Sequence, residues 1–524
     1  MPCFQLWRDR HAIHPHAGAG AGDGLPVRCW RRRWVGVLLS LGLLLGPGVL
    51  QAERETRLPI AITGMQSLPG PPEALREGRP PACRAWLPTL LPGQQQTACR
   101  PVPTSSLANT MAILLALIVL IMIVYGVRHV VFTLNRLLGR QHHPYLHVET
   151  ARWPTVTVFI AAHNEELVVA GCIEALLDID YPAECLKIIP VNDRSTDRTR
   201  EIIDDYVERH PGRIQPFHRT SGKPGKAAAL KDAMAHAVGD IVIIFDADYV
   251  PGRNLLKQLT APFFDPEVGA VMGRVVPINA GANLLTRMLD LERSGGYQVD
   301  QQARMNLRLV PQYGGTVGGV RQSAIAAIGG WSDDMLAEDT DMTYRLLING
   351  WKTVYSNRSE CYEEVPQEWS VRIRQVKRWA KGHNQVLGRY WLQLLRSPFI
   401  SPRERLDGAL LLLVFIMPPI LLAGWVLAVG LYYLDSEPAL STFIPAFALM
   451  AYSSLGNFAA FFEIVSAVLL DGSRRRLRLL PINLLCFFVS LFAISESVAS
   501  VIMDRMFKRE LVWDKTIRYR APAK

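Results

Sequence analysis

Cysteine is scarce in this sequence, and its few residues are not arranged like the ligands of a metal site. The chain has 8 cysteines among 524 residues. Four of them stand far apart, without the close spacing of zinc ligands, and we interpret each as a plain buried thiol. These four are Cys172, Cys185, Cys361 and Cys486. Cys83 and Cys99 fall in a segment that we place outside the membrane, where a disulfide and two free thiols fit equally well.

A concentrated block of charge is missing as well. The formal net charge is +10, but no single segment carries it, which argues against a nucleic-acid partner. Basic clusters instead lie beside apolar runs, at residues 31–33, 128–140 and 474–478. Such clusters are typical of the cytoplasmic flanks of membrane helices.

The N-terminal part shows no pattern of a folded domain. Residues 1–52 combine a His-, Gly- and Ala-rich start, expected to be disordered, with a basic and then apolar stretch that ends at Ala52. A cleaved signal peptide and a first membrane helix both fit this stretch. Residues 53–105 are rich in Pro, Gly and Gln, which predicts an extracytoplasmic loop open to an envelope partner subunit.

Several long apolar runs predict a membrane protein. Mean hydropathy is positive, at +0.12. A bilayer-spanning helix takes roughly 20 apolar residues, and residues 106–128 meet this requirement. The arginines that follow place the next segment, residues 140–385, in the cytoplasm.

The C-terminal part predicts interfacial helices over residues 386–405 and about three spanning or re-entrant helices within 406–503. The runs are Leu406–Leu434, with a kink expected at Pro418 and Pro419, Ile444–Leu470 and Ile482–Met503. The basic tail, residues 504–524, favours the cytoplasm, whereas three full spans would place it outside. A re-entrant segment, a reversed first helix and a tail that departs from the charge rule all remain open.

Residues 140–385 alternate short β-rich runs with helical stretches. This alternation predicts βαβ units, a mostly parallel sheet and helices on both faces. Ligands bind beyond the carboxyl ends of such strands. Polar residues follow three of the predicted strands there: His163, Asn164 and Glu165; Asn192 and Asp193; and Asp246 and Asp248.

The run "VIIFDAD" ends in two acids at positions i and i+2. In a continued strand Asp246 and Asp248 would point to the same face, where a cation would relieve their repulsion. Carboxylates suit Mg²⁺ or Mn²⁺, which bridge phosphates readily. An ordinary strand end with two solvated acids fits the stretch as well.

Two helical segments add candidate residues. In "AEDTDMTYRL", Glu338 and Asp339 at a helix start fit either the helix dipole or a general base. In "QVKRW", Gln375, Arg378 and Trp379 share one helix face, which fits phosphate and sugar binding or a membrane-surface helix.

Glycine-rich segments complete the set of motifs. The run "QYGGTVGGVRQ" permits close backbone approach or simple turns. In "SGKPGKAAAL", Lys223 and Lys226 stand at a helix start, which fits phosphate binding or a solvated cap.

The order of these motifs resembles that of the processive, membrane-bound family-2 glycosyltransferases. This group includes the cellulose, chitin, hyaluronan and poly-N-acetylglucosamine synthases. The resemblance covers about residues 150–390, and the run "VWDKT" in the tail is similar too. It implies a family-A glycosyltransferase domain inserted between transmembrane helices in the inner membrane, with the catalytic domain in the cytoplasm.

The resemblance also implies roles for individual residues. Asp339 matches the catalytic base, with Glu338 beside it. Asp246 and Asp248 match the metal and nucleotide-sugar site, with Asp248 the more direct metal ligand. The expected nucleotide-sugar residues are Asn164, Glu165, Asp193, Lys226, Asp246 and Arg378, and Gln375 and Trp379 are expected at the acceptor. Asn192 stands where many relatives have another Asp, a departure from the family's pattern.

The implied reaction is an inverting transfer from a nucleotide sugar, expected to be a UDP-sugar, to a growing β-linked glycan, coupled to export. Transfer of one sugar to a lipid carrier is the nearest alternative. A transporter is disfavoured because only Glu463 and Glu496 among the acids considered lie within predicted spans. A non-catalytic scaffold is disfavoured because the acids are intact.

Overall fold

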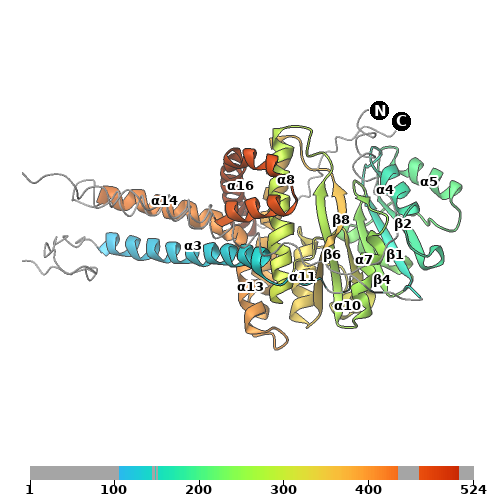
Figure 1. The fold of residues 1–524 in the computed structure, drawn as a ribbon, viewed down its shortest axis with the longest axis horizontal. Coiled ribbons are helices and arrows are strands. Elements are labelled where there is room, and N and C mark those ends of the chain that lie inside the picture. Colours follow the sequence, from blue (N-terminus) through green and yellow to red (C-terminus); the bar gives the residue numbers. More distant parts are fainter. Residues whose placement is uncertain (1–105, 144, 146–147, 149–151, 435–458, 507–524) are drawn as a thin grey trace, which may run out of the picture. The chain divides into compact units, whose positions relative to one another are not determined.

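The computed structural model describes residues 106–143, 145, 148, 152–434 and 459–506 (Figure 1). Several predictions fall outside these residues. They are the signal segment, the loop at 53–105, the Cys83–Cys99 pairing, the first part of the 444–470 span and the tail. Among the described cysteines, three are buried free thiols as predicted, while Cys185 is half-buried.

The first half of the sheet is parallel, as the alternation predicts. Its strands run in the order β3-β2-β1-β4. Their bounds are β1 (Val156–Ala162), β2 (Leu186–Asp193), β3 (Phe217–Arg219) and β4 (Ile241–Asp246). Strands β1 and β4 are buried almost without interruption, so both faces of the sheet are covered. The connecting helices are α4 (Val169–Leu177), α5 (Thr199–Arg209) and α6 (Lys226–Ala233), with short turns η1 (Ala183–Cys185) and η2 (Met234–His236).

The second half of the sheet adds two strands, β7 and β5, that run against the others. The order continues β4-β7-β6-β8-β5, where β7 is antiparallel to both β4 and β6, and β8 is parallel to β6 but antiparallel to β5. The bounds are β5 (Val250–Pro251), β6 (Val268–Pro277), β7 (Gly318–Arg321) and β8 (Lys352–Glu363). Glycine permits the inserted strand, because a Cβ on Gly318 would lie 2.6 Å from the Val271 carbonyl oxygen.

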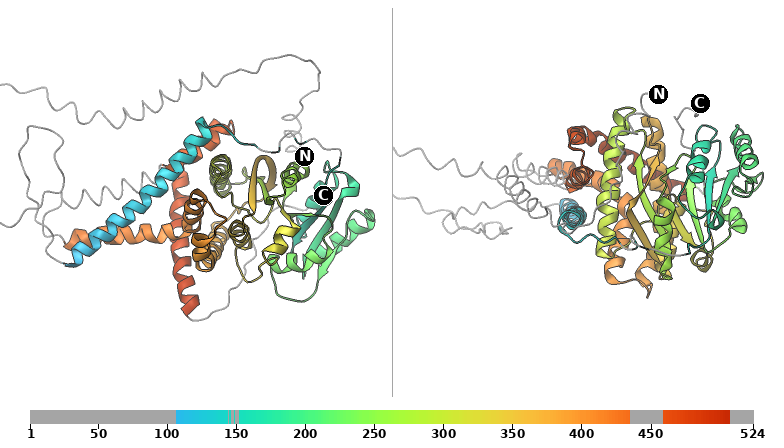
Figure 2. Two further views of the ribbon diagram at one scale, coloured as in Figure 1. Left: turned by 90° about the horizontal axis from the view of Figure 1, so that it is seen from below. Right: turned by 45° about the vertical axis from the view of Figure 1, so that its right-hand side comes forward.

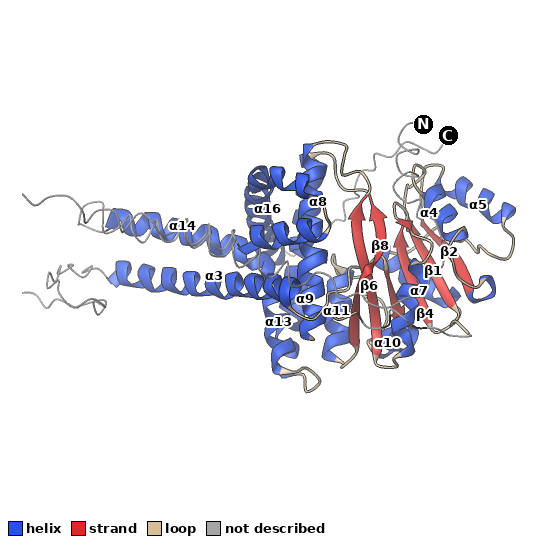
Figure 3. Cartoon of the chain, viewed as in Figure 1, coloured by secondary structure: helices blue, strands red, loops and turns tan. Residues whose placement is uncertain are grey.

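This domain has further helices, several of which lie beside β6 and β8 (Figures 1 and 3). They are α7 (Leu255–Thr260), η3 (Ala261–Phe264), α8 (Leu284–Ser294), the π-helix η4 (Gly295–Gln301), α9 (Gln302–Leu307), α10 (Gln322–Ala327), α11 (Glu338–Ile348) and α12 (Trp369–Arg396). Residues 386–405 were predicted as interfacial helices; 386–396 form the last turns of α12 and 402–405 begin α13 (Pro402–Leu412), and their interfacial position stays a prediction. Leu394 of α12 and Leu412 of α13 share one apolar cluster.

Three segments of the described chain are long and apolar enough to cross a membrane: Thr110–Leu138, Pro402–Leu431 and Arg474–Val501. They comprise α3 (Ser106–Leu138), then α13 with η5 (Val414–Ile416) and α14 (Met417–Leu434), then η6 (Arg474–Leu479) with α16 (Leu480–Met506). A shorter apolar helix covers Ala459–Leu470. Helices α3 and α14 pack together near Leu115 and Ala428 and diverge from there (Figure 2, left).

The expected break in the second segment lies just before the proline pair. The α-helix stops at Leu412, and a new one starts at Met417, so that Pro418 and Pro419 occupy its first turn. Proline is tolerated there because the first amide groups of a helix have no intrahelical acceptor. The two prolines therefore begin a helix rather than kink one.

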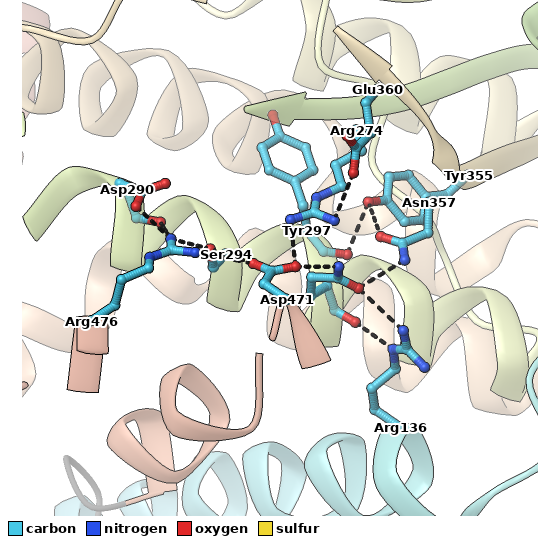
Figure 4. Close-up of polar contacts among 11 residues, drawn as sticks. Arg136, Arg274, Asp290, Ser294, Tyr297, Tyr355, Asn357, Glu360, Asp471 and Arg476 are labelled. Carbon is cyan, nitrogen blue, oxygen red and sulfur yellow. Dashed lines mark hydrogen bonds and ion pairs between the residues drawn. The ribbon is translucent and has the colours of Figure 1, made fainter. Parts of the chain in front are cut away.

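A buried polar network joins the apolar helices to the sheet domain (Figure 4). Asp471, after the 459–470 helix, accepts hydrogen bonds from Arg274 of β6 at 2.9 Å and from Gln298 of η4 at 2.6 Å. It also accepts one from Ser294 at 3.0 Å. The backbone carbonyl of Gln298 in turn accepts from Arg136 of α3 at 2.7 Å. The π-helix is therefore the point where β6, α3 and the 471 turn meet.

Candidate active site

The predicted strand ends do meet at one edge of the sheet. In the parallel register Ala162 lies beside Asn192, and Ala161 lies beside Asp246. Asp193 and Asp246 are the last residues of β2 and β4. The structure therefore brings the polar residues at these strand ends together at one edge of the sheet, and their role stays a prediction.

The two acids of "DAD" do not share a strand face. Strand β4 ends at Asp246, and the next residues form a turn closed by the Tyr249 amide, which donates to the Asp246 carbonyl at 3.1 Å. Asp248 lies in this turn and is 2% exposed, whereas the Asp246 side chain is 27% exposed. The expectation from i, i+2 alternation is therefore wrong, because that alternation applies only within a strand.

Asp193 is held by three donors. Its Oδ1 accepts from Arg219 at 2.8 Å and from Arg194 at 3.0 Å, and its Oδ2 accepts from the Gly225 amide at 3.0 Å. These contacts link the end of β2 to the N-terminal end of α6, which begins at Lys226. They fix the loop between β3 and α6 beside the site.

Asn164 and Glu165 tie the loop after β1 to the loop after β2. The Asn164 side-chain oxygen accepts from the Thr196 amide at 2.7 Å, and the Glu165 amide donates to Thr199 at 2.8 Å. Asn164 adopts a φ of 55°, a left-handed conformation that asparagine tolerates better than most residues. Asn192 is 3% exposed and contacts His218 at 3.1 Å, so its side chain serves the interior of the fold.

Lys226 connects the donor-side acid to the start of α11. Its Nζ lies 2.5 Å from Asp246 and 4.0 Å from Glu338, and it donates to the Gly315 carbonyl at 2.9 Å. Burial alone would lower the pKa of Lys226, but the carboxylates of Asp246 and Glu338 more than offset this and raise it. The ammonium therefore remains charged among the acids.

Helix α11 begins at Glu338, as the acid-rich motif predicts. Burial raises the pKa of Glu338 and of Asp339, while nearby Lys226 and Arg378 act to lower both. A Cβ on Gly315 would lie 3.1 Å from the Asp339 Cβ, so the glycine-rich run packs directly against this acid. A carboxylate with a raised pKa is a stronger base than a solvated one, which suits proton abstraction.

Helix α12 borders the same site with the "QVKRW" residues. Arg378 acts electrostatically on both acids of α11, and Gln375 and Trp379 line a cavity of about 190 Å³. Arg293 and Arg372 line the cavity as well, and each guanidinium lies over the Trp379 ring, at 5.4 and 5.3 Å from its centre. The helix thus lies beside both the acids and the cavity.

A third strand that ends in an acid, β8, contributes residues that the sequence analysis missed. Strand β8 runs in the same direction as β4, since β7 is antiparallel to β4 and to β6, and β6 is parallel to β8. Its last residue, Glu363, accepts from the Tyr249 hydroxyl at 2.7 Å and lies 2.7 Å from Arg293. Burial alone would lower the pKa of Arg293, but Glu363 more than offsets this and raises it. In the sequence, the run "CYEEV" places acids at the end of a β-rich stretch, as "DAD" does. No motif marks Arg293.

The acids at this edge fit a divalent cation that is shared with a diphosphate. No group of three or more His, Cys, Asp or Glu side chains suited to a metal occurs in the described part of the chain. Asp246 and Asp248 offer the oxygen donors that Mg²⁺ and Mn²⁺ prefer. One or two carboxylates suffice where substrate phosphates supply further ligands.

Comparison with known proteins agrees with this architecture. Residues 154–382 match the family model described as "Glycosyltransferase like family 2". The probable glycosyltransferase YdaM of Bacillus subtilis (strain 168) is 30% identical over 381 residues, which are 70% of this chain and 87% of that protein. The beta-monoglucosyldiacylglycerol synthase of Synechocystis sp. is 31% identical over 271 residues, 51% of this chain and 56% of that protein.

Two further proteins extend the comparison. Glucomannan 4-beta-mannosyltransferase 7 of Arabidopsis thaliana is 32% identical over 261 residues, so the match covers about half of each chain, 48% and 47%. The solved structure of the mannosyltransferase PcManGT from Pyrobaculum calidifontis, in complex with GDP-Man and Mn²⁺, has a TM-score of 0.50 and 20% identity. It covers 69% of this chain and 98% of that chain, which shows a shared fold.

The fold has the mixed α/β architecture of the family-A glycosyltransferases. The chain belongs to glycosyltransferase family 2. Its activity is therefore glycosyl transfer from a nucleotide-sugar donor.

Proposed function

We propose that the protein is an inverting, membrane-bound hexosyltransferase that extends a β-linked polysaccharide at the cytoplasmic face of the inner membrane. The observation that carries this proposal is the convergence of four groups at one sheet edge. Lys226 lies within 4.0 Å of both Asp246 and Glu338, and it acts electrostatically on Asp339 beside them. Three candidate membrane spans in the described chain support the location.

In the proposed reaction Asp339 removes the proton from the acceptor hydroxyl. The resulting oxygen attacks the anomeric carbon opposite the leaving diphosphate, so a single displacement inverts the configuration. Arg378 acts on this site and would stabilise charge on the diphosphate. A divalent cation, held by Asp248 and Asp246 and supplied as Mg²⁺ or Mn²⁺, would neutralise the leaving group. The use of Mn²⁺ with a nucleotide sugar by PcManGT supports this assignment.

The donor pocket in this proposal is bordered by Asn164, Glu165, Asp193 and Lys226. Asp193 already holds two guanidinium groups and a backbone amide. We therefore assign it to shaping the pocket wall as well as to contacting the base. A uridine nucleotide is the donor to test first.

The acceptor lies against Gln375 and Trp379 in the proposed arrangement, since both line the cavity beside α12. An indole face suits the apolar face of a sugar ring. The alternative acceptor is a lipid. It is favoured by the position of Leu289 and Val365, which line the cavity and also pack in one apolar cluster with Cys486 of α16, a candidate membrane span.

A donor panel tests the proposal. Membranes with the full chain would be incubated with radiolabelled UDP- and GDP-sugars and Mn²⁺ or Mg²⁺, and product length and linkage would be determined. We expect a β-linked polymer. Single-sugar lipid products would support the alternative, and an α-linkage from an α-linked donor would contradict inversion. Asp339→Asn should lower kcat on the order of 10²-fold or more, and full activity in a folded variant would refute its role.

A further inference from the structure

One side chain touches both halves of the candidate site. Arg293 is in the last turn of α8 and is half-buried. Its Nε lies 2.7 Å from Glu363 Oε1, and its guanidinium lies 5.4 Å from the centre of the Trp379 ring. It therefore contacts the indole of the proposed acceptor site and the carboxylate at the end of β8.

The contact to Glu363 continues to the turn that carries the donor-side acids. Glu363 Oε2 accepts from the Tyr249 hydroxyl at 2.7 Å, and both side chains are largely buried. Tyr249 directly follows Asp248, and its amide closes the turn by donating to the Asp246 carbonyl at 3.1 Å. The two oxygens of Glu363 thus join Arg293 to the turn, one partner on each.

The chain of contacts from Arg293 through Glu363 to Tyr249 is fixed by further neighbours. Glu363 is the last residue of β8 and pairs with Pro277 of β6, so its backbone belongs to the sheet. The neighbouring Tyr297 of η4 interacts electrostatically with Arg293, Glu363 and Asp339. Charge-assisted contacts of this kind, when buried, fix side-chain positions more firmly than exposed ones.

A second arginine on the same indole lacks this connection. Arg372 lies 5.3 Å from the Trp379 ring centre, and it pairs with Glu292 at 2.6 Å and donates to Gln375 at 3.1 Å. These contacts of Arg372 lie around the cavity, whereas Arg293 also reaches Glu363. The two arginines therefore form a matched pair that differs in one link.

We propose that Arg293 is a positioning residue that holds the acceptor-side Trp379 in register with the donor-side turn at Asp246–Asp248, through Glu363 and Tyr249. This inference rests on the proposed function, because it uses the donor and acceptor roles assigned there. A displacement of about 1 Å at either side would be costly, since transfer depends on the distance between the acceptor oxygen and the anomeric carbon. The link fixes that distance from outside the reacting groups.

The test compares Arg293→Met with Arg372→Met in the detergent-solubilised full chain. Affinity for UDP and for GDP in the presence of Mn²⁺ would be measured by calorimetry, and kcat and KM for transfer would be measured separately. Both variants should lower transfer about tenfold or more, because both disturb Trp379. Only Arg293→Met should weaken nucleotide binding, by about three- to tenfold, because only Arg293 connects to the turn.

Two further variants test the connection from Arg293 through Glu363 to Tyr249. Tyr249→Phe removes only the hydroxyl and should weaken nucleotide binding as Arg293→Met does, while Arg293→Lys should recover part of the affinity. Elution as a single species in size-exclusion chromatography would confirm folding. Equal nucleotide affinity in the two methionine variants would overturn the proposal, and so would unchanged affinity in Tyr249→Phe. Full transfer by Asp339→Asn would instead contradict the proposed function. The comparison of nucleotide affinity between Arg293→Met and Arg372→Met would still test the role of Arg293.

Discussion

Gly382 sets the distance between the two helices that carry the catalytic groups. It is buried in α12, four residues after Arg378 and one turn from Trp379. A Cβ at this position would lie 2.6 Å from the Ala337 backbone nitrogen and 3.1 Å from its Cα. Ala337 immediately precedes Glu338 and Asp339, so α12 rests directly on the start of α11.

The substitution Gly382→Ala sets two effects against each other. Alanine is the better helix former, by about 1 kcal/mol in an exposed helix interior. Against this, the new Cβ would crowd the Ala337 Cβ most closely, and its 2.6 Å gap to the Ala337 backbone nitrogen must widen to at least the 3.4 Å of ordinary van der Waals contact. Overpacking of this kind costs about 1–3 kcal/mol, so we expect equal or lower stability. The same movement separates Arg378 from the acids, which should lower kcat about 10²-fold.

The assay measures kcat, KM and the thermal midpoint of the purified variant. The matched control is Gly126→Ala, since Gly126 also lies in a helix but a Cβ there would meet nothing within 4 Å. The control should keep its activity. The reasoning is refuted if Gly382→Ala transfers sugar at the rate of the unchanged protein, because the contact with Ala337 would then not set the catalytic geometry.

Three other perturbations test separate parts of the structure. Lys226→Met should shift the acidic limb of the pH profile of kcat/KM to higher pH. The reason is that Lys226 lowers the pKa of Asp339, which must be deprotonated to act as base. An acidic limb at unchanged pH would contradict this. Asp471→Ala should lower the free energy of unfolding by about 1–3 kcal/mol, since Gln298 loses a buried acceptor while Arg274 keeps its ion pair with Glu360. Asp471→Asn, measured in the same denaturation assay, should lose less. Excess EDTA should abolish transfer and Mn²⁺ should restore it, whereas full activity in EDTA would count against a metal.

Local patterns predicted the edge of the sheet well, because each required only the neighbouring residues. The runs that end at Asp193 and Asp246 are short, apolar and followed by polar residues, and parallel pairing then brings their ends together. The acids of α11 were also found at a helix start, where the sequence places them. The parallel half of the sheet and the position of the candidate site follow from such patterns.

Features that depend on distant segments could not be read in this way. Strand β7 lies between β4 and β6 only because Gly318 and Gly319 allow its neighbours to approach, and nothing local in "GGVR" gives its direction. The place where β4 stops decides the exposure of Asp248, and a strand boundary is set by pairing across the sheet. Arg293 has no motif at all, since its partner Glu363 is 70 positions further along the chain.

Helix α12 explains how the site is fixed relative to the candidate membrane spans. Its 28 residues include Gln375, Arg378 and Trp379 near the start, and its backbone at Lys377 accepts a hydrogen bond from Ser497 of α16 at 2.8 Å. Both ends of the proposed reaction therefore depend on the same element: Arg378 acts on the acids of α11, while Trp379 lines the cavity beside the cluster that includes α16. Leu289 and Val365 belong to both the cavity and this cluster, so the proposed acceptor site lies beside a candidate membrane span.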